Sequence, residues 1–328
     1  MKYFYPKLHS LHKPKIDYSD GLPGYEHKES DDRVDLILEG LLKAKEVEVI
    51  YVEELATKEV KEIHDDNYVD FLLEISNIIE KDEEYIPSIF RKSMTMAPLH
   101  FRGGMYCEEI GTPIGKESVK SALNSAQTAI EASKYMLKNS EDVFVLTRPP
   151  GHHAGKKRYG GYCFFNNAYL AANTFNKNGK KVAVIDIDYH IGDGSLEFAS
   201  NVAPYFSIHA GTNKSYPYNE FKSSPYVNLQ EFEAGVSIKE YMVFLEKILE
   251  DIRQKDIDII IVSLGFDILE TDPLQDAHTC IKLADFTKIA EAFSTVKQKI
   301  MFLLEGGYDT ENLSQATQNF MNGFSCQR

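Results

Sequence analysis

The chain has 328 residues, of which 43% are hydrophobic and 26% are charged, so it is long enough for one large α/β domain or two ordinary ones and lacks the apolar depletion of disordered chains. Its formal net charge of -14 argues against binding to nucleic acid or to an anionic membrane, and it would attract cationic small molecules. It contains no run of about 18 apolar residues, and its first residues lack a secretory signal pattern, so we expect a cytoplasmic protein.

The first third of the chain contains two helical patterns, at 31–45 and 67–81, and a short strand pattern between them at 47–54. The stretch 87–116 then predicts a long irregular excursion, which we expect to restrict a cavity or to form a homodimer contact. No linker composition interrupts the sequence, so we expect a single domain over 1–328.

From residue 117 onward, helical and strand patterns alternate. The strand patterns are at 142–147, 182–187, 204–210, 257–266 and 300–308, and the helical patterns are at 117–137, 166–176, 237–254 and 283–299. This alternation predicts an α/β fold with a mainly parallel sheet and helices on both faces. Ligands of such sheets bind beyond the carboxyl ends of the strands, so we expect the active site there.

The strand at 182–187 runs directly into the sequence DYHIGDG, which places charged side chains where apolar ones should continue. Because strand side chains alternate between faces, Asp186, Asp188 and His190 share one face. Burying unpaired carboxylates is costly, so either a structural network of hydrogen bonds or a metal ion must compensate them. With Asp267 after the next apolar strand, Asp188 and His190 form a donor set that suits Zn²⁺ and also Fe²⁺ or Mn²⁺.

Two adjacent histidines, His152 and His153, follow the turn sequence RPPG. Beside a metal they would form a general acid/base pair, with Asp186 and Asp193 available to orient them, although such a pair alone is more often incidental. Tyr308 follows EGG and would stabilise an oxyanion beside a metal-bound carbonyl, although a lone tyrosine there is more often a core residue.

Five motifs in this order resemble the arginase/histone deacetylase superfamily, and the resemblance runs from about residue 20 to the end. The motifs are RPPGHHA (148–154), GGYCFFNNAYLAA (160–172), VIDIDYHIGDGS (184–195), SLGFDILETDPL (263–274) and LLEGGY (303–308). HDDNYVDFL (64–72) and GTPIG (111–115) are similar to its acetylpolyamine amidohydrolase and bacterial histone deacetylase-like branch.

The resemblance implies a role for each matched residue. It implies zinc on Asp188, His190 and Asp267, an acid/base pair of His152 and His153, and polarisation of the amide carbonyl by Tyr308. It implies that Asp186 holds His152 and that Asp193 holds His153. It also implies a structural K⁺ beneath the site, touched by the side chains of Asp186, Asp188 and Ser207 and by the backbone carbonyl of His190.

For the substrate, the resemblance suggests Tyr162 and Tyr216 as the aromatic walls of a tunnel, with Gly161 allowing close approach to the backbone. Leu274 stands where we align a glutamate that reads a distant ammonium in some polyamine deacetylases. In this respect the chain is similar to lysine deacylases, although Glu108 and Glu109 lie close to the aligned loop.

Two positions depart from the family pattern. Ile191 replaces a second histidine that is not a ligand, so we expect the metal site to survive. Asp193 replaces the usual asparagine and should favour a charged His153 more than asparagine would, which would shift the pH optimum.

The sequence thus predicts a zinc-dependent deacetylase of N-acetylated amines, with acetylpolyamines as the favoured substrate and N-acetyl-lysine as the alternative. A two-metal guanidino or formamide hydrolase would need a D-x-H-x-D arrangement, and Ile191 stands between His190 and Gly192 here. A ligand-binding module similar to acetoin-utilisation proteins is the non-enzymatic alternative, against which the intact His152, His153 and Tyr308 argue.

Four widely spaced cysteines complete the sequence-based predictions. Cys107, Cys163, Cys280 and Cys326 form no C-x-x-C pair, so we expect reduced thiols rather than disulfides or a thiolate zinc site.

Overall fold

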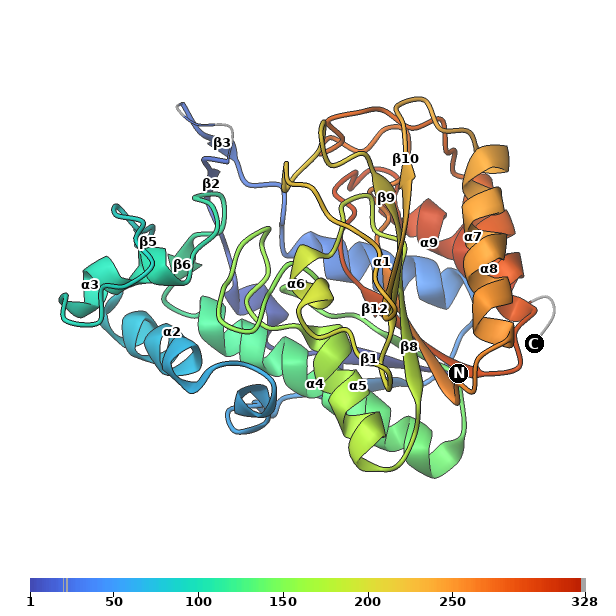
Figure 1. The fold of residues 1–328 in the computed structure, drawn as a ribbon, viewed down its shortest axis with the longest axis horizontal. Helices are drawn as coiled ribbons and strands as arrows, with labels where there is room; N and C mark the ends of the chain where they lie inside the picture. The colour runs from blue at the N-terminus through green and yellow to red at the C-terminus, as the bar shows by residue number, and fades with distance from the viewer. Residues whose placement is uncertain (20, 22, 326–328) are drawn as a thin grey trace.

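A central parallel sheet organises the computed structural model, which describes residues 1–19, 21 and 23–325. Within these residues, eight strands form the sheet, and each of its strand pairs is parallel (Figure 1). In spatial order they are β10 (Val227–Phe232), β9 (Tyr205–Ala210), β8 (Val182–Asp186), β11 (Ile259–Leu264), β12 (Lys299–Leu304), β7 (Val143–Val145), β1 (Lys2–Pro6) and β4 (Val49–Val52). All carboxyl ends therefore meet at one edge of the sheet.

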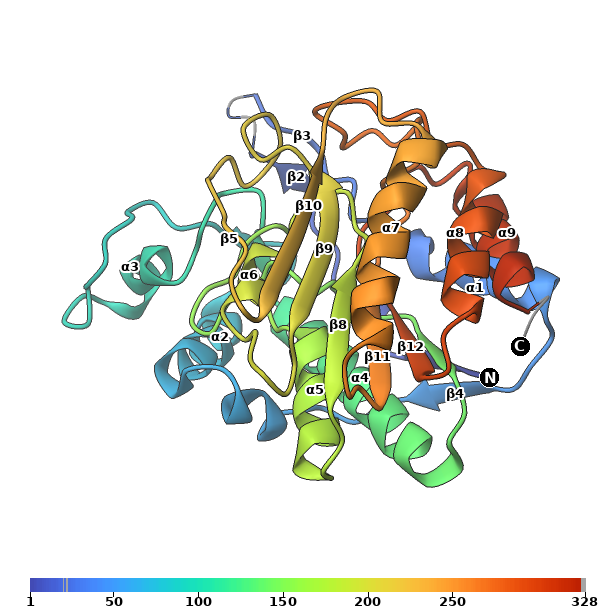
Figure 2. The same cartoon turned by 45° about the vertical axis from the view of Figure 1, so that its right-hand side comes forward.

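Helices cover both faces of this sheet (Figures 1 and 2). The longer ones are α1 (Asp32–Ala44), α2 (Asp66–Ile78), α4 (Ser118–Asn139), α5 (Asn167–Lys177), α7 (Ile238–Arg253), α8 (Asp285–Ser294) and α9 (Leu313–Ser325). Along β8, Ala183 and Ile185 pack in the core layer shared with α1, α7, α8 and α9, whereas Val182 and Val184 pack in the layer shared with α4 and α5. Because successive side chains of β8 point to opposite faces and helices cover both, the strand is buried on both sides.

Side-chain caps fix where several helices begin. Ser237 and Glu240 form a reciprocal capping box at the start of α7, and Asp65 accepts from the backbone N–H groups of the first turn of α2. Asn166 caps α5 through Tyr169 N, and its Nδ2 also donates to Ala154 O at 3.2 Å and Ser195 Oγ at 3.0 Å. The same residue therefore starts α5 and also contacts the loop at Ala154 and the short helix that contains Ser195.

Several short elements lie outside the main sheet. They are η1 (His9–Leu11), η2 (Glu59–Glu62), α3 (Leu99–Arg102), η3 (Gly103–Met105), α6 (Asp193–Leu196) and the antiparallel pairs β2 (Ile16–Asp17) with β3 (Tyr25–Glu26) and β5 (Glu84–Tyr85) with β6 (Ile114–Gly115). The predicted excursion 87–116 is largely irregular, with α3, η3 and β6 within it.

The structure confirms the predicted fold class and adds elements that the sequence patterns did not reveal. Strands β1 and β10 and helix α9 were not predicted. Strand β10 lies at the sheet edge and is only partly buried, so it lacks the apolar run that marks the central strands. None of the helices in the described ranges is both long and apolar enough to span a membrane.

The cysteines fit the prediction as far as the structure describes them. Cys107, Cys163 and Cys280 are free thiols, whereas Cys326 lies outside the described residues.

Candidate metal-dependent active site

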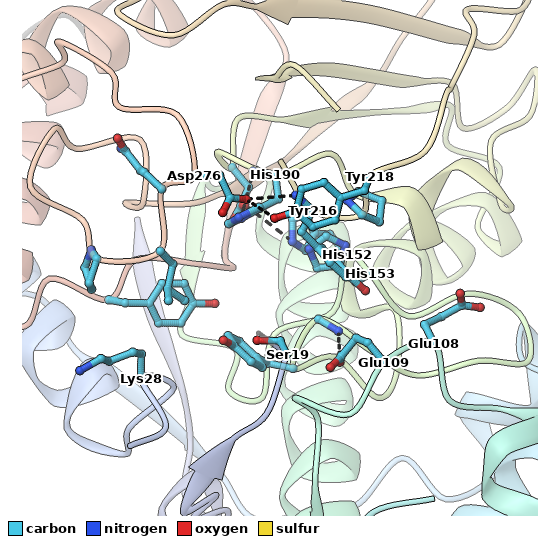
Figure 3. Close-up of a pocket in the computed structure, with 18 of the residues that line it drawn as sticks. Ser19, Lys28, Glu108, Glu109, His152, His153, His190, Tyr216, Tyr218 and Asp276 are labelled. Carbon is cyan, nitrogen blue, oxygen red and sulfur yellow. Dashed lines mark hydrogen bonds and ion pairs between the residues drawn. The ribbon is translucent and has the colours of Figure 1, made fainter. Parts of the chain in front are cut away.

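The loops after five strands of the sheet converge on one cavity of about 600 Å³ (Figure 3). The loop after β7 carries His152 and His153, the loop after β8 carries Asp188 and His190, and the loop after β12 carries Tyr308. The full lining is Ser19, Tyr25, Lys28, Glu108, Glu109, His152, His153, Gly161, Tyr162, Asp188, His190, Tyr216, Pro217, Tyr218, Pro273, Leu274, Gln275, Asp276 and Tyr308. The predicted catalytic and substrate-contacting positions are therefore adjacent in space.

Asp188, His190 and Asp267, which we call the metal-ligand cluster, gather at the bottom of the site. His190 Nδ1 lies 3.4 Å from Asp188 Oδ1 and 3.3 Å from Asp267 Oδ2. The other oxygens have backbone partners, because Gly306 N donates to Asp188 Oδ2 at 2.8 Å and Tyr189 N donates to Asp267 Oδ1 at 3.0 Å. One oxygen of each carboxylate is thus held in place while the other faces the imidazole.

A metal ion fits this donor set. Asp267 Oδ2 is buried, and no donor in the described part of the chain reaches it in hydrogen-bond geometry. The candidate ligand atoms of the cluster lie within 4.8 Å of one another. Two carboxylates and one imidazole around an open position are the donors of a catalytic rather than a closed structural zinc site.

The pKa values of Asp267 and His190 reflect the excess of negative charge in the metal-ligand cluster. Burial and the adjacent Asp188 raise the pKa of Asp267 to about 8. Burial opposes a charge on His190, but the adjacent carboxylates of Asp188 and Asp267 raise its pKa to about 10. The excess of carboxylates in the cluster therefore favours added positive charge, either a proton or a metal cation.

His152 and His153 are held at their Nδ1 atoms by separate carboxylates. Asp186 Oδ2 lies 3.1 Å from His152 Nδ1, and Asp193 Oδ1 lies 2.7 Å from His153 Nδ1. Burial disfavours a charged His152, but Asp188 and Asp186 outweigh it and raise its pKa well above the usual value. Burial and the charge of His152 lower the pKa of His153 to about 4, against the raising effect of Asp193. The pair therefore combines a charged and a neutral imidazole at neutral pH.

Arg158 is a partner of this pair that the sequence motifs did not reveal. Its Nη1 donates to Asp193 Oδ2 at 2.8 Å, while its Nε donates to Glu197 Oε1 at 2.7 Å. Asp193 acts to raise the pKa of His153, but it also accepts from Arg158, and burial and the charge of His152 lower this pKa to about 4. His153 is therefore neutral at pH 7, and the expected effect of aspartate relative to asparagine stays a prediction.

A second group of candidate ligands, His152, Cys163 and Glu305, lies behind the histidine pair. Both oxygens of Glu305 are occupied, since Oε2 accepts from Gly151 N at 2.7 Å and Oε1 accepts from Ser263 Oγ at 2.9 Å. Burial raises the pKa of the Cys163 thiol well above its usual value, so the thiol stays protonated. This group is satisfied by hydrogen bonds and does not resemble a second metal site.

Tyr308 lies against a buried ion network formed by Glu29, Arg33 and Arg148, which we call the arginine cluster. The guanidinium carbon of Arg33 is 4.4 Å from the centroid of the Tyr308 ring, and Arg33 Nη2 donates to Glu305 O at 2.8 Å. Arg33 also donates through Nε to Gly307 O, so the turn that presents Tyr308 is fixed from beneath. Sequence patterns gave no signal for this cluster, because Glu29 and Arg33 lie outside the quoted motifs and Arg148, although it begins RPPGHHA, is 119 residues from Glu29.

The predicted walls surround the cavity. Tyr216 meets the ring of His153 edge to face with centroids 4.9 Å apart, and Tyr162 meets Tyr308 in the same way at 5.8 Å. Gly161 is seated directly on His153, because a Cβ at this position would lie 2.3 Å from His153 Cδ2. Leu274 also lines the cavity.

The residues suggested for a potassium ion are adjacent beneath the site. Asp186 and Ser207 are opposite each other in the parallel pair of β8 and β9, and both are fully buried. Ser207 Oγ lies 2.9 Å from His209 Nδ1, and Asp186 Oδ1 accepts from Asp188 N at 3.1 Å.

Comparison with family models matches residues 27–324 to the histone deacetylase domain. The chain belongs to the histone deacetylase family. Acetylpolyamine amidohydrolase 2 of Pseudomonas aeruginosa is 27% identical, over 90% of this chain and 91% of its own. Acetylpolyamine amidohydrolase of Burkholderia pseudomallei is 26% identical, over 100% and 99% of the two chains.

A solved structure shows the same fold for this member of the histone deacetylase family. The crystal structure of acetylpolyamine aminohydrolase from Burkholderia pseudomallei superposes with a TM-score of 0.92 at 24% identity, covering 100% of this chain and 99% of that one. The agreement extends to the full arrangement of strands and helices that positions the site.

Proposed function

We propose that this chain is a metal-dependent amidohydrolase that removes acetyl groups from N-acetylated amines, with acetylpolyamines as its substrates. The observation that carries the proposal is the convergence of the metal-ligand cluster, the paired histidines and Tyr308 on one cavity. The two bacterial relatives with acetylpolyamine amidohydrolase names, each matched over nearly its whole length, support the substrate class.

The metal in this proposal is Zn²⁺ held by Asp188, His190 and Asp267, and Fe²⁺ suits the same donors. When bound, such an ion lowers the pKa of water and polarises a carbonyl group. The unpartnered oxygen of Asp267 and the raised pKa of about 8 of its carboxyl support this assignment.

The histidines would divide the proton transfers. His153 is neutral and is held at Nδ1 by Asp193, so its Nε2 can accept a proton from the attacking water and then deliver it to the leaving amine. His152 stays charged beside Asp186 and stabilises negative charge near the reacting carbon. The Tyr308 hydroxyl would donate to the carbonyl oxygen, whose negative charge grows in the transition state.

Carboxylates on the cavity lining support a substrate that carries a second cationic group. The Glu108 side chain is 47% exposed to solvent. Asp276 is also exposed, and its Oδ2 accepts from Tyr218 Oη at 3.0 Å (Figure 3). Lys28 lines the cavity apart from these carboxylates (Figure 3). An extended amine could therefore place its distal ammonium beside Glu108 or Asp276.

The test is a panel of acetylputrescine, acetylspermidine and acetyl-lysine peptides on the zinc-loaded protein, with acetate release as the measurement. The proposal expects release from the acetylated polyamines, abolition by a chelator and restoration by Zn²⁺. Glu108→Gln and Asp276→Asn should raise KM for acetylspermidine more than for acetylputrescine. Binding of these amines without acetate release would instead favour a ligand-binding module.

A deacetylase of N-acetyl-lysine is the second candidate. Leu274 favours this second candidate, because an apolar side chain lines the cavity at the position where a carboxylate would bind the distal ammonium group of a polyamine. Faster acetate release from acetyl-lysine peptides than from either acetylpolyamine would select this candidate.

We also propose that a K⁺ ion binds beneath the metal-ligand cluster, at Asp186, Asp188, Ser207 and the His190 carbonyl. The shared register and full burial of Asp186 and Ser207 support this site. Thermal unfolding in KCl and in tetramethylammonium chloride tests it, since K⁺ should raise the midpoint.

For the excursion 87–116 we propose a contact between two copies of the chain. Ile89, Phe90 and Met96 are exposed on it, Met96 to 96%. Sedimentation should give a dimer that Phe90→Ser weakens.

A further inference from the structure

The wall of the cavity beside the reacting groups is a turn with unusual backbone geometry. Gly161 and Tyr162 both have positive φ, +52° and +65°. A tyrosine adopts this left-handed conformation at a cost, so surrounding contacts must hold it. The turn touches His153 through Gly161 and Tyr308 through the Tyr162 ring, so its position decides the space left for a substrate between those groups.

The contacts that hold the turn come from distant parts of the chain, first from the segment 109–112. Gly161 N donates to Glu109 Oε1 at 3.0 Å, the bond drawn at Glu109 in Figure 3. Tyr162 N donates to Thr112 Oγ1 at 2.8 Å. Thr112 Oγ1 donates in turn to Glu109 Oε1 at 2.5 Å, and Gly111 N donates to Glu109 Oε2. Glu109 thus connects the 109–112 segment to the backbone of the turn.

A second carboxylate holds the other end of Tyr162. The phenol donates to Asp17 Oδ2 at 2.5 Å, and Asp17 is fully buried. Its Oδ1 accepts from Ser19 N at 2.8 Å and from Ser19 Oγ at 2.7 Å, and Tyr25 Oη donates to its Oδ2 at 3.2 Å. These donors surround one buried carboxylate, which holds the phenol of Tyr162 in one place.

The two anchors meet at Gly111. A Cβ there would lie 2.5 Å from Asp17 Oδ1 and 2.8 Å from Glu109 Oε2, so the two segments are in direct contact. His27 Nε2 also lies 3.0 Å from Gly111 O, and its ring is 4.6 Å from that of Tyr162. The β2–β3 pair and the 109–112 segment therefore act on the turn as one unit.

We propose that Asp17 and Glu109 are positioning residues that hold the Gly161–Tyr162 turn against His153 and Tyr308 and thereby set the width of the cavity at the reacting amide. This inference rests on the proposed function, because the width of the cavity affects turnover only if the acyl group of the substrate binds between the turn, His153 and Tyr308. The two carboxylates would make the site selective for a short acyl chain.

Tyr162→Phe tests the proposal with the smallest change, because it removes the bond to Asp17 and keeps the ring. We expect KM for the acetylated amine to rise with a smaller change in kcat, and the preference in kcat/KM for acetyl over butyryl amines to fall about tenfold. Asp17→Asn should have the same effect. The double variant should then add little to either single one, because both remove the same interaction.

Glu109→Gln tests the second anchor. The amide group cannot accept from Gly111 N and Gly161 N at the same time, since one of them would face its NH₂. We therefore expect the same loss of acyl selectivity. Glu26→Gln is the matched control, because it changes an exposed carboxylate on β3 of the same outer pair and should leave the selectivity unchanged.

An unchanged preference for acetyl in both Tyr162→Phe and Glu109→Gln would overturn the proposal. If the wild-type protein hydrolysed none of these amides, the proposed function would fail, and crystal structures of the two variants would then test the positioning. Displacement of residues 161–162 from His153 would support it, and an unmoved turn in both would refute it.

Discussion

The arginine cluster and the metal-ligand cluster are both buried and charged, but they differ in how completely their charges are compensated. In the arginine cluster, Glu29 accepts from Arg148 Nε at 2.7 Å and from Arg33 Nη1 at 3.0 Å. Arg148 also donates to the carbonyl oxygens of His9 and His12. In the metal-ligand cluster, Asp267 Oδ2 has no hydrogen-bond partner among the described residues.

This difference separates a structural network from a ligand site. Burying ions is tolerated when the chain itself supplies the counter-charges and hydrogen bonds, as it does around Glu29. Where buried carboxylates outnumber the cationic side chains around them, protons or an added cation must balance their charge. The raised pKa of Asp267 shows that this carboxylate lacks such a counter-charge from the chain. Removing a charge should therefore damage activity in one cluster and stability in the other.

The largest effect is expected for Asp267→Asn. A catalytic metal supplies several kcal/mol of transition-state stabilisation, so losing it should lower turnover about 10,000-fold, at about 1.4 kcal/mol for each factor of ten. Metal content by mass spectrometry and acetate release measure the effect, while circular dichroism should show an intact fold. Asp276→Asn, which changes an exposed carboxylate of the same cavity, should retain its metal. Full metal content in Asp267→Asn would remove this residue from the ligand set.

Glu29→Gln should have the largest effect on stability. It leaves Arg33 and Arg148 buried without their anion, and breaking a buried ion pair in this way costs about 3–5 kcal/mol. Urea unfolding measures the loss. Glu39→Gln on the same helix region removes an exposed i,i+4 pair with Lys43 and should change stability by about 0.5 kcal/mol or less. Equal losses in the two variants would contradict the assignment of the arginine cluster as a structural network.

Tyr308→Phe examines the place where the two clusters meet. The substitution removes the hydroxyl but keeps the ring beneath Arg33, so the fold and the metal content should persist. Loss of one donor to a developing oxyanion lowers kcat about 100-fold or more. Steady-state kinetics on an acetylated amine measure it, and a nearly normal kcat would exclude Tyr308 from the reaction.

The metal-ligand cluster could be predicted from sequence because its residues follow apolar strands directly. Asp188 and His190 come just after β8, and Asp267 comes just after the adjacent β11, so the period of the strand and the parallel order of the sheet bring them together. The parallel α/β class followed from the same alternation.

The arginine cluster and the anchors of the turn could not be predicted in this way. Glu29 and Arg148 are 119 residues apart, and Asp17 and Tyr162 are 145 residues apart. Each pair joins two segments outside the main sheet and the longer helices, and neither periodicity nor turn chemistry specifies which of these segments meet. Strand β1 was missed because its five residues, Lys2–Pro6, form too short a pattern of alternation to be recognised in the sequence.

The smallest effect is expected for Asp193→Asn, which tests how strongly a carboxylate of the chain affects the pKa of His153. His153 accepts a proton only when neutral, so the acid limb of kcat/KM follows its pKa. Burial and His152 hold that pKa at about 4 while Asp193 raises it, so removing the carboxylate should lower it further and move the acid limb to lower pH. A weaker base with a looser orientation should also lower kcat about tenfold.

Glu197→Gln is the control for Asp193→Asn. It removes another partner of Arg158 and keeps Asp193 on His153, so its acid limb should not move. An acid limb that does not move in Asp193→Asn would mean that Asp193 acts on His153 through position rather than through charge.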